Sequence, residues 1–248
     1  MTQILTCFLT VKPCELFYNF VKQLPDLSNV YICIDDNEYN IPNYQNEVKI
    51  IKYQNDICEN EGFKDTHSAI KGATSREKAL YYFYKNDDIN YDYIWFIEED
   101  VFIPNINTIQ NINNKYESGD LLSAKNDKNY KYNMKRWHWK LVTKQLKDKF
   151  ELPYVSSMIC AIRCSKKLLN CIFDFANKHK TLFFCETMFN TIAYHNNLKT
   201  NTIKELEGIV WRKQGPRGGG WKKEHIKQHC LYHPIKSIEK QYEYRENI

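Results

Sequence analysis

Three consecutive carboxylates, Glu98, Glu99 and Asp100, follow a run of apolar and aromatic residues that begins at Tyr93. β-Branched and aromatic residues favour a strand, and ligands of open α/β sheets bind at the carboxyl ends of strands. Adjacent carboxylates repel one another, and a divalent cation that relieves this repulsion can also bind phosphate oxygens. The triplet therefore indicates a cation site for a phosphate-containing ligand. The alternative is an ordinary polar exit from a strand into a loop.

A second acidic pair, Asp35-Asp36, follows another predicted strand, 30–34. An earlier strand over 4–9 and a helical pattern after it complete a β-α-β unit, which implies parallel strands. The pair is therefore expected at the same sheet edge as the triplet. The alternative is that both residues begin a turn with Asn37.

A helix is predicted from Thr74, because Thr74 and Glu77 have the spacing of a capping box. Arg76 and Lys78 stand in its first turn, where the helix dipole favours anions and disfavours cations. A bound phosphate at this helix end would remove the conflict. Alternatively, both cations point into water.

Further strands are predicted over 48–51, 121–122 and 155–162, with a helix after Pro104 and another capped by Ser165. The polar stretch 125–131 reads as a loop.

Glu186 interrupts the otherwise apolar stretch 183–189. It is either a solvent-facing residue at a helix start or a partly buried acid whose pKa is raised toward that of a general base. Trp137-His138-Trp139 could form an aromatic wall for a sugar ring, although such tryptophans are more often part of a core.

The C-terminal region contains half of all the glycines, between 215 and 220, beside an arginine, two lysines and Trp221. This loop could be a lid over phosphates or a plain surface segment. His225, His229 and His233 recur at helical spacing, but Pro234 and the lack of cysteine or carboxylate partners argue against a zinc site made by all three. A single histidine near a metal is the preferred interpretation.

The composition of the 248 residues sets outer limits on class and function. No Pro/Gly/Ser-rich linker divides the chain, so a single domain, 1–248, is expected. The net charge of +5 is modest and its charges are interleaved, which argues against a nucleic-acid specialist. No apolar segment approaches the roughly 20 residues that span a bilayer, and no signal peptide is evident, so a cytoplasmic protein is expected. The nine cysteines form no C-x-x-C pair and are expected to be reduced.

Two motifs resemble a family of nucleotide-diphospho-sugar transferases with the GT-A fold, found in large DNA viruses and eukaryotic microbes. They are Lys78-Ala-Leu-Tyr-Tyr-Phe83 and Trp95-Phe-Ile-Glu-Glu-Asp-Val-Phe-Ile103. The resemblance implies an α/β, GT-A-like (Rossmann-like) fold with a central mixed, mostly parallel sheet flanked by helices. Two departures are Glu99, where the family usually has Asp, and the approach to Lys78, which lacks the usual Trp and leaves the role of Arg76 open.

The resemblance also implies a division of labour. Residues 1–104 would form the nucleotide-sugar half, and 105–248 the acceptor half with a C-terminal lid. The implied roles are Asp100 as the main Mn²⁺ or Mg²⁺ ligand, His233 completing the metal site, Glu98 and Glu99 on the metal or the donor, Asp35 or Asp36 on the nucleotide base, Lys78 on the donor, and Glu186 on the acceptor side.

The residues and the resemblance together predict transfer of a sugar from a nucleotide diphosphate to a hydroxyl of a glycan or glycoprotein, with inversion if Glu186 reaches that hydroxyl. The resemblance alone implies UDP as the nucleotide. Two other classes stay open. Clustered carboxylates near lysine also serve metal-dependent nucleases and nucleotidyltransferases. A non-catalytic carbohydrate-binding or nucleic-acid-binding module would use the aromatic residues and the positive net charge.

Overall fold

The computed structural model describes residues 2–42, 47–67, 70–132, 138–211 and 220–246. Within these ranges the main sheet has seven strands in the order β11-β7-β10-β6-β1-β2-β3. Its strands are β1 (Ile4–Thr10), β2 (Val30–Ile34), β3 (Lys49–Lys52), β6 (Tyr93–Glu98), β7 (Leu121–Ser123), β10 (Ala161–Ser165) and β11 (Thr200–Thr202). All neighbours are parallel except β10, which is antiparallel to both β6 and β7. The expected mixed, mostly parallel sheet is confirmed.

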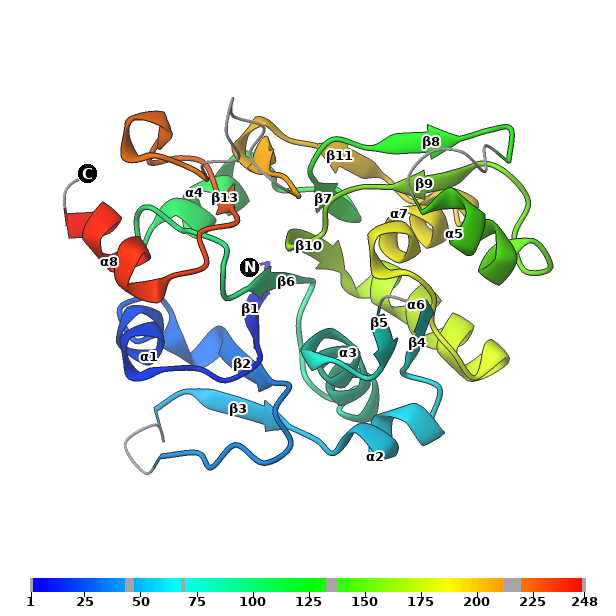
Figure 1. Ribbon diagram of the computed structural model, residues 1–248, viewed down its shortest axis with the longest axis horizontal. Coiled ribbons are helices and arrows are strands. Elements are labelled where there is room, and N and C mark those ends of the chain that lie inside the picture. The colour runs from blue at the N-terminus through cyan, green and yellow to red at the C-terminus, as the bar shows by residue number, and fades with distance from the viewer. Residues whose placement is uncertain (1, 43–46, 68–69, 133–137, 212–219, 247–248) are drawn as a thin grey trace.

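Helices and three small strand pairs surround this sheet (Figure 1). The helices are α1 (Glu15–Val21), α2 (Asn55–Asn60), α3 (Ser75–Lys85), α4 (Thr108–Lys115), α5 (Trp139–Leu146), α6 (Lys166–His179), α7 (Cys185–His195) and α8 (Ile238–Glu246), with short 3₁₀ turns at Leu27–Asn29, Lys204–Leu206 and Lys223–His225. The pairs are β4 (Asp65–His67) with β5 (Ile70–Gly72), β8 (Asp127–Asn129) with β9 (Tyr154–Ser156), and β12 (Gly208–Ile209) with β13 (Tyr232–His233).

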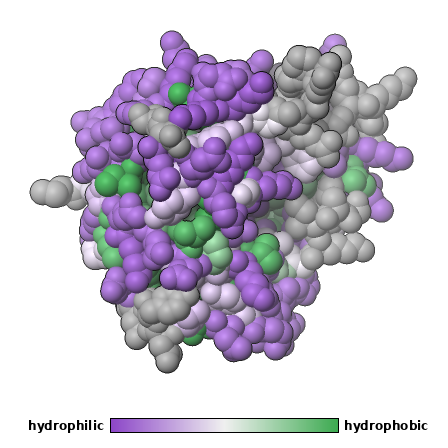
Figure 2. Space-filling view, turned by 60° about the vertical axis from the view of Figure 1, so that its left-hand side comes forward, coloured by the Kyte–Doolittle hydropathy of each residue, from purple (hydrophilic) through white to green (hydrophobic). Residues whose placement is uncertain are grey.

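The sheet divides the core into two halves because successive side chains of a strand point to opposite faces. In β1, Leu5, Cys7 and Leu9 pack with α3, α5, α6 and α7, whereas Phe8 packs on the other side with α1 and α4. On the face of the molecule shown in Figure 2, hydrophilic side chains predominate and hydrophobic ones form small separate groups. Burial of both sheet faces therefore accounts for the continuous apolar runs in the sequence.

The single strand predicted over 155–162 is wrong, because the chain bends after Ser156. Residues 154–156 form β9 and pair with β8, while 161–165 form β10 in the main sheet. The predicted loop 125–131 therefore contains a strand, β8. The bend leaves Cys160 just before β10, where its carbonyl oxygen accepts a hydrogen bond from the Glu98 N–H at 2.8 Å.

All nine cysteines are free thiols, as expected. Among the described residues, no helix combines the length and the apolar composition needed to cross a bilayer.

Candidate active site

The acidic triplet lies at the carboxyl end of β6, and its neighbours in the sheet send its members in different directions. Glu98 ends the strand and bonds to the Cys160 carbonyl on the β10 side, while the Glu99 N–H donates to Leu9 O of β1 at 2.9 Å. The chain then turns, with the Val101 N–H donating to Glu98 O at 3.0 Å. The three adjacent carboxylates therefore have different neighbours.

Glu98 and Asp100 face His233, which comes from β13 near the other end of the chain. The His233 Nε2 lies 3.4 Å from Asp100 Oδ1 and 3.9 Å from Glu98 Oε2. Backbone contacts hold the two segments together, because the Ile235 N–H donates to Asp100 O at 2.8 Å and Phe102 bridges Tyr232. The predicted association of His233 with Asp100 is present in the fold.

The hydrogen bonds of His233 determine which ring nitrogen faces the carboxylates. Its Nδ1 lies 2.7 Å from the Val210 carbonyl oxygen, and because a carbonyl only accepts, Nδ1 carries the proton. In the neutral ring Nε2 then presents a lone pair to two carboxylates, which is repulsive unless a proton or a cation lies between them. Burial lowers the pKa of His233, but the hydrogen bond and charge of Asp100, the bond to Val210 and the charge of Glu98 outweigh it and raise this pKa.

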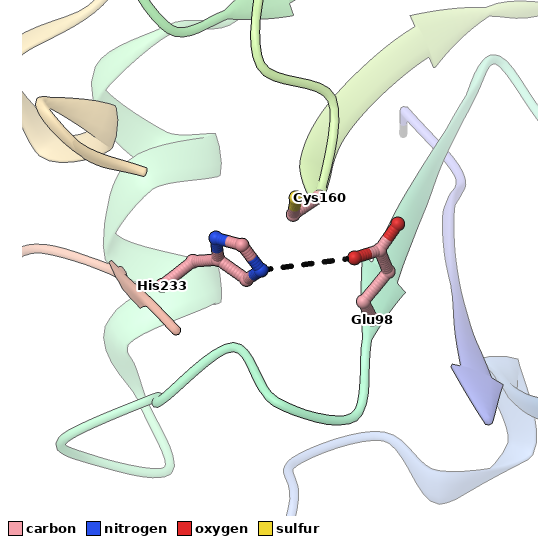
Figure 3. Close-up of side chains that lie close together, drawn as sticks. All are labelled: Glu98, Cys160 and His233. Atoms are coloured by element: carbon pink, nitrogen blue, oxygen red, sulfur yellow. Dashed lines mark ion pairs between the residues drawn. The ribbon is translucent and has the colours of Figure 1, made fainter. Parts of the chain in front are cut away.

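Cys160 is the third member of this cluster and was not identified from the sequence, which predicted only a reduced thiol there. One ligand atom each from Glu98, Cys160 and His233 lies within 4.8 Å of the others, and the three side chains converge (Figure 3). The thiol is buried, at 6% exposure. Nothing in the local sequence signals this contact, because it depends on β10 running antiparallel beside β6.

Arg76 provides the positive charge nearest to the triplet. The capping box of Thr74 and Glu77 is confirmed, and it begins α3 so that Arg76 points to the end of β6, where its Nη2 donates to Glu98 Oε1. The Arg76 side chain is only 8% exposed, and its Nε–H has no acceptor among the described residues. Burial lowers the pKa of Arg76, but the acidic groups around it, among them Cys185, Glu98 and Glu186, raise it above the ordinary value.

Lys78 is fully buried and reaches the loop that follows β2. Its Nζ donates to the Asp35 carbonyl oxygen and to Asn37 Oδ1 at 2.7 Å, and it lies 3.6 Å from Asp35 Oδ1. Asp36 accepts from the Glu38 N–H at 2.8 Å, the turn geometry that was the alternative prediction for the acidic pair. The ammonium group of Lys78 therefore holds this loop at the sheet edge.

Glu99 points toward β1 and away from His233. Its carboxylate accepts from the Thr10 hydroxyl at the carboxyl end of that strand. Burial raises the pKa of Glu99, the Thr10 hydrogen bond lowers it, and the charges of Asp100 and Glu98 raise it, with a net increase. Because the Asp35 N–H donates to Thr10 O at 2.9 Å, Thr10 joins the two predicted acidic groups.

Glu186 lies in the first turn of α7 and is buried, so the solvent-facing alternative is wrong. Its Oε2 accepts from the Cys185 thiol at 2.9 Å, and its backbone carbonyl accepts from the Ser157 N–H at 3.0 Å. The charges of Glu98 and Glu186 both raise the pKa of Arg76. Of these two carboxylates, Glu98 forms the ion pair with the guanidinium.

A cavity of about 520 Å³ adjoins the His233 side of the cluster. Val210 links the two, because it lines the cavity and its carbonyl accepts from His233. Apolar side chains dominate the wall, and Trp211 is 66% exposed. The lining residues are Ala124, Lys125, Met158, Thr202, Leu206, Glu207, Ile209, Val210 and Trp211.

A second cavity of about 510 Å³ lies at the other end of the sheet strands, beside Gln3, Asn29 and Asn113. Its described lining includes none of the predicted site residues.

The tryptophan and histidine patterns predicted from the sequence do not form binding surfaces among the described residues. Trp139 is buried in the core, at 3% exposure, and forms no binding wall. His233 belongs to a strand and His225 to a 3₁₀ turn, so the helical histidine face does not form. Trp137 and most of the glycine-rich loop, 212–219, lie outside the described residues.

No protein-family model and no curated protein matches this chain. Several solved structures are similar in fold. A glycosyltransferase involved in the glycosylation of the major capsid of PBCV-1 has 11% identity and a TM-score of 0.43, over 99% of this chain and 100% of its own. The galactosyltransferase LgtC with donor and acceptor sugar analogs has 9% identity and a TM-score of 0.46, over 99% and 96%.

A 4-diphosphocytidyl-2C-methyl-D-erythritol synthase from Anaerococcus prevotii is similar at 8% identity and a TM-score of 0.46, over 99% of this chain and 95% of its own. Likeness at these values concerns the fold and does not assign an activity. The chain itself has the α/β architecture that was expected, with a mostly parallel mixed sheet and acidic residues at the carboxyl ends of its central strands.

Proposed function

We propose that this protein is a metal-dependent glycosyltransferase that moves a sugar from a nucleotide-diphosphate donor, preferably a UDP-sugar, to a hydroxyl group of a glycan or glycoprotein. The observation that carries the proposal is the arrangement of His233, whose Nδ1 is committed to Val210 while Nε2 faces Glu98 and Asp100. The Nε2 atom lies 3.4 Å from one carboxylate oxygen and 3.9 Å from the other, and carboxylate oxygens and imidazole nitrogens are donors suited to a divalent cation.

Asp100, Glu98 and His233 would hold the ion, for which the resemblance suggests Mn²⁺ or Mg²⁺. The ion would supply positive charge against the diphosphate that leaves the sugar. Arg76 is the protein's own cation at this place, and its Nε–H is available to donate a hydrogen bond to a phosphate oxygen. A phosphate oxygen there would satisfy a buried donor that the described residues leave without an acceptor.

The nucleotide would lie over the carboxyl ends of β1 and β2, next to Asp35 and Asp36. Lys78 contributes by holding the backbone of this loop, so we assign it a positioning role beside the donor role that the resemblance implies. Glu99 is bonded to Thr10 and would face the donor rather than the ion.

The acceptor would approach from the cavity beside β12. The exposed Trp211 offers a flat apolar surface for the C–H face of a sugar ring. Glu186 would take the proton of the attacking hydroxyl as its oxygen bonds to the anomeric carbon and the bond to the diphosphate breaks. Attack from the face opposite the leaving group gives inversion.

The test is thermal unfolding with UDP, GDP and CDP and their sugars, each with and without Mn²⁺. We expect a nucleotide to stabilise the protein only when Mn²⁺ is present, and Asp100→Ala to lose this effect while the exposed control Asp88→Ala keeps it. Stabilisation of Asp100→Ala equal to that of the native protein would refute the site. Turnover of nucleic acid or of a sugar-1-phosphate, without sugar transfer, would select the phosphoryl-transfer alternative.

A further inference from the structure

Cys160 changes the chemical character of the proposed cation site. Its backbone is held opposite Glu98, because its carbonyl accepts the Glu98 N–H at 2.8 Å as β6 pairs with β10. Its Sγ lies within 4.8 Å of ligand atoms of both Glu98 and His233. An ion that draws the carboxylate and the imidazole together therefore has the sulfur in reach.

The surroundings of Cys160 differ from those of the other buried cysteines. Cys7, Cys33 and Cys164 lie within the apolar core with α3 and α6. Cys160 packs in the apolar cluster on the other face of the sheet, but unlike those three it also lies beside Glu98 and His233 (Figure 3). It therefore combines a core position with contact to two metal-ligating side chains.

Donor type sets which cation a site prefers. Mg²⁺ takes oxygen ligands, whereas Zn²⁺ and Co²⁺ bind thiolate and imidazole well. The cluster offers one sulfur, one imidazole nitrogen and a carboxylate oxygen of Glu98, which are all donor types that Zn²⁺ takes in proteins.

We propose that Cys160 is a ligand of this cation site and gives it a preference for Zn²⁺ or Co²⁺ over Mn²⁺ and Mg²⁺. On binding, the sulfur–metal bond forms and the thiol proton is released to solvent. This inference deepens the proposed function, on whose cation site it rests. It replaces the expectation of a purely hard, oxygen-based site with a mixed one.

The experiment uses the full chain in a Cys14→Ser background, which removes the exposed thiol. Zn²⁺ and Mn²⁺ affinities are measured by competition with a chelating dye, and Co²⁺ binding by absorption spectroscopy. We expect a near-ultraviolet thiolate-to-cobalt band that disappears in Cys160→Ser. Its Zn²⁺ affinity should fall by at least about 100-fold, because loss of outer-shell partners alone costs about 10- to 100-fold. Its Mn²⁺ affinity should change by less than about 3-fold, since Mn²⁺ favours oxygen donors.

Cys160→Ala serves as a second variant, in case a buried serine impairs folding, and circular dichroism checks both. Cys164→Ser is the matched control for a buried thiol outside the cluster, and it should keep the cobalt band. If the band and the Zn²⁺ affinity survive in both Cys160 variants, the inference is refuted while Mn²⁺-dependent nucleotide binding still supports the proposed function. If no divalent cation binds the native protein at all, the proposed function fails with it.

Discussion

Replacing Arg76 with methionine removes a buried counter-charge from the candidate site. The guanidinium donates to Glu98 and lies among the charges of Glu77 and Glu186. Without it, the ion-pair partner that remains to Glu98 among the described residues is His233 in its protonated form. We therefore expect Arg76→Met to destabilise the fold when no metal is present.

The size of this effect follows from the exposure of the two partners. Breaking a fully buried ion pair costs about 3–5 kcal/mol, and an exposed one at most about 1 kcal/mol. The Arg76 side chain is 8% exposed and that of Glu98 is 31% exposed, so the cost should lie between, at about 2–3 kcal/mol. For a chain of this size, each kcal/mol lowers Tm by about 2–4 °C, which predicts a decrease of about 4–12 °C.

A divalent cation should repair part of this loss, because it takes over as counter-charge for Glu98. Arg76 and the ion compete for the same carboxylate in the native protein, so Mn²⁺ should raise the free energy of unfolding more in Arg76→Met than in the native chain. Urea unfolding with and without Mn²⁺ measures both quantities.

Lys115→Met is the matched control for this experiment. Lys115 pairs with the buried Glu205, away from the triplet. The control should lose stability without any additional gain from Mn²⁺. Equal Mn²⁺ effects in the two variants, or a loss below about 1 kcal/mol in Arg76→Met, would refute the assignment of Arg76 as the counter-charge of the site.

Three further outcomes are expected. Glu186→Gln should lower the transfer rate by about 10²- to 10⁴-fold while donor affinity, measured by calorimetry, is unchanged; a full rate would remove Glu186 as general base. Trp211→Ala should raise the acceptor KM by about 2- to 13-fold, equivalent to about 0.5–1.5 kcal/mol of stacking, with kcat constant, and an unchanged KM would exclude the Trp211 cavity as the acceptor site. Burial raises the pKa of Glu205, but its hydrogen bonds to Lys115, to its own backbone and to Tyr116 outweigh this effect, so the pKa is lowered. The ionised carboxylate therefore stabilises the fold above the ordinary glutamate pKa, and this stabilisation is lost as pH falls through the lowered pKa. The difference in unfolding free energy between the native chain and Glu205→Gln should therefore shrink as pH falls below about 5, and a constant difference would contradict this.

The fold could be predicted where local pattern and burial agree. β2 and the helix α6 capped by Ser165 appear as expected, since a buried strand reads as a continuous apolar run and a capped helix has the hydroxyl at its N-terminus. The stretch 155–162 failed because it is apolar on both sides of a bend. Residues 154–156 pair with β8 and residues 161–165 pair with β6. Tertiary contacts determine this division, and hydrophobic periodicity does not reveal them.

The placement of the acidic residues at one sheet edge could be predicted from the sequence, and the resemblance pointed to His233 beside Asp100. Parallel topology brings the ends of β1, β2 and β6 to one edge, so Asp35 and the triplet could be placed together from strand order alone. Two features could not be derived. Arg76 donates a hydrogen bond to Glu98, whereas the sequence had suggested a phosphate as its partner. Cys160 joins the cluster because β10 runs antiparallel beside β6, and no local sequence motif predicts that pairing.

Besides providing His233, the C-terminal segment holds the backbone around Asp100. The Gln241 side chain donates to the Glu99 carbonyl at 2.9 Å, and Arg245 donates to the Ile103 carbonyl at 2.9 Å, so α8 holds the backbone on both sides of Asp100. The β12–β13 pair places Val210 between the histidine and the Trp211 cavity. A cation bound to Asp100 and His233 would therefore connect the carboxyl end of β6, through Val210, to the wall of the Trp211 cavity. The same few contacts position the cation ligands and the cavity wall. Changes in metal occupancy should therefore alter acceptor affinity as well as donor affinity.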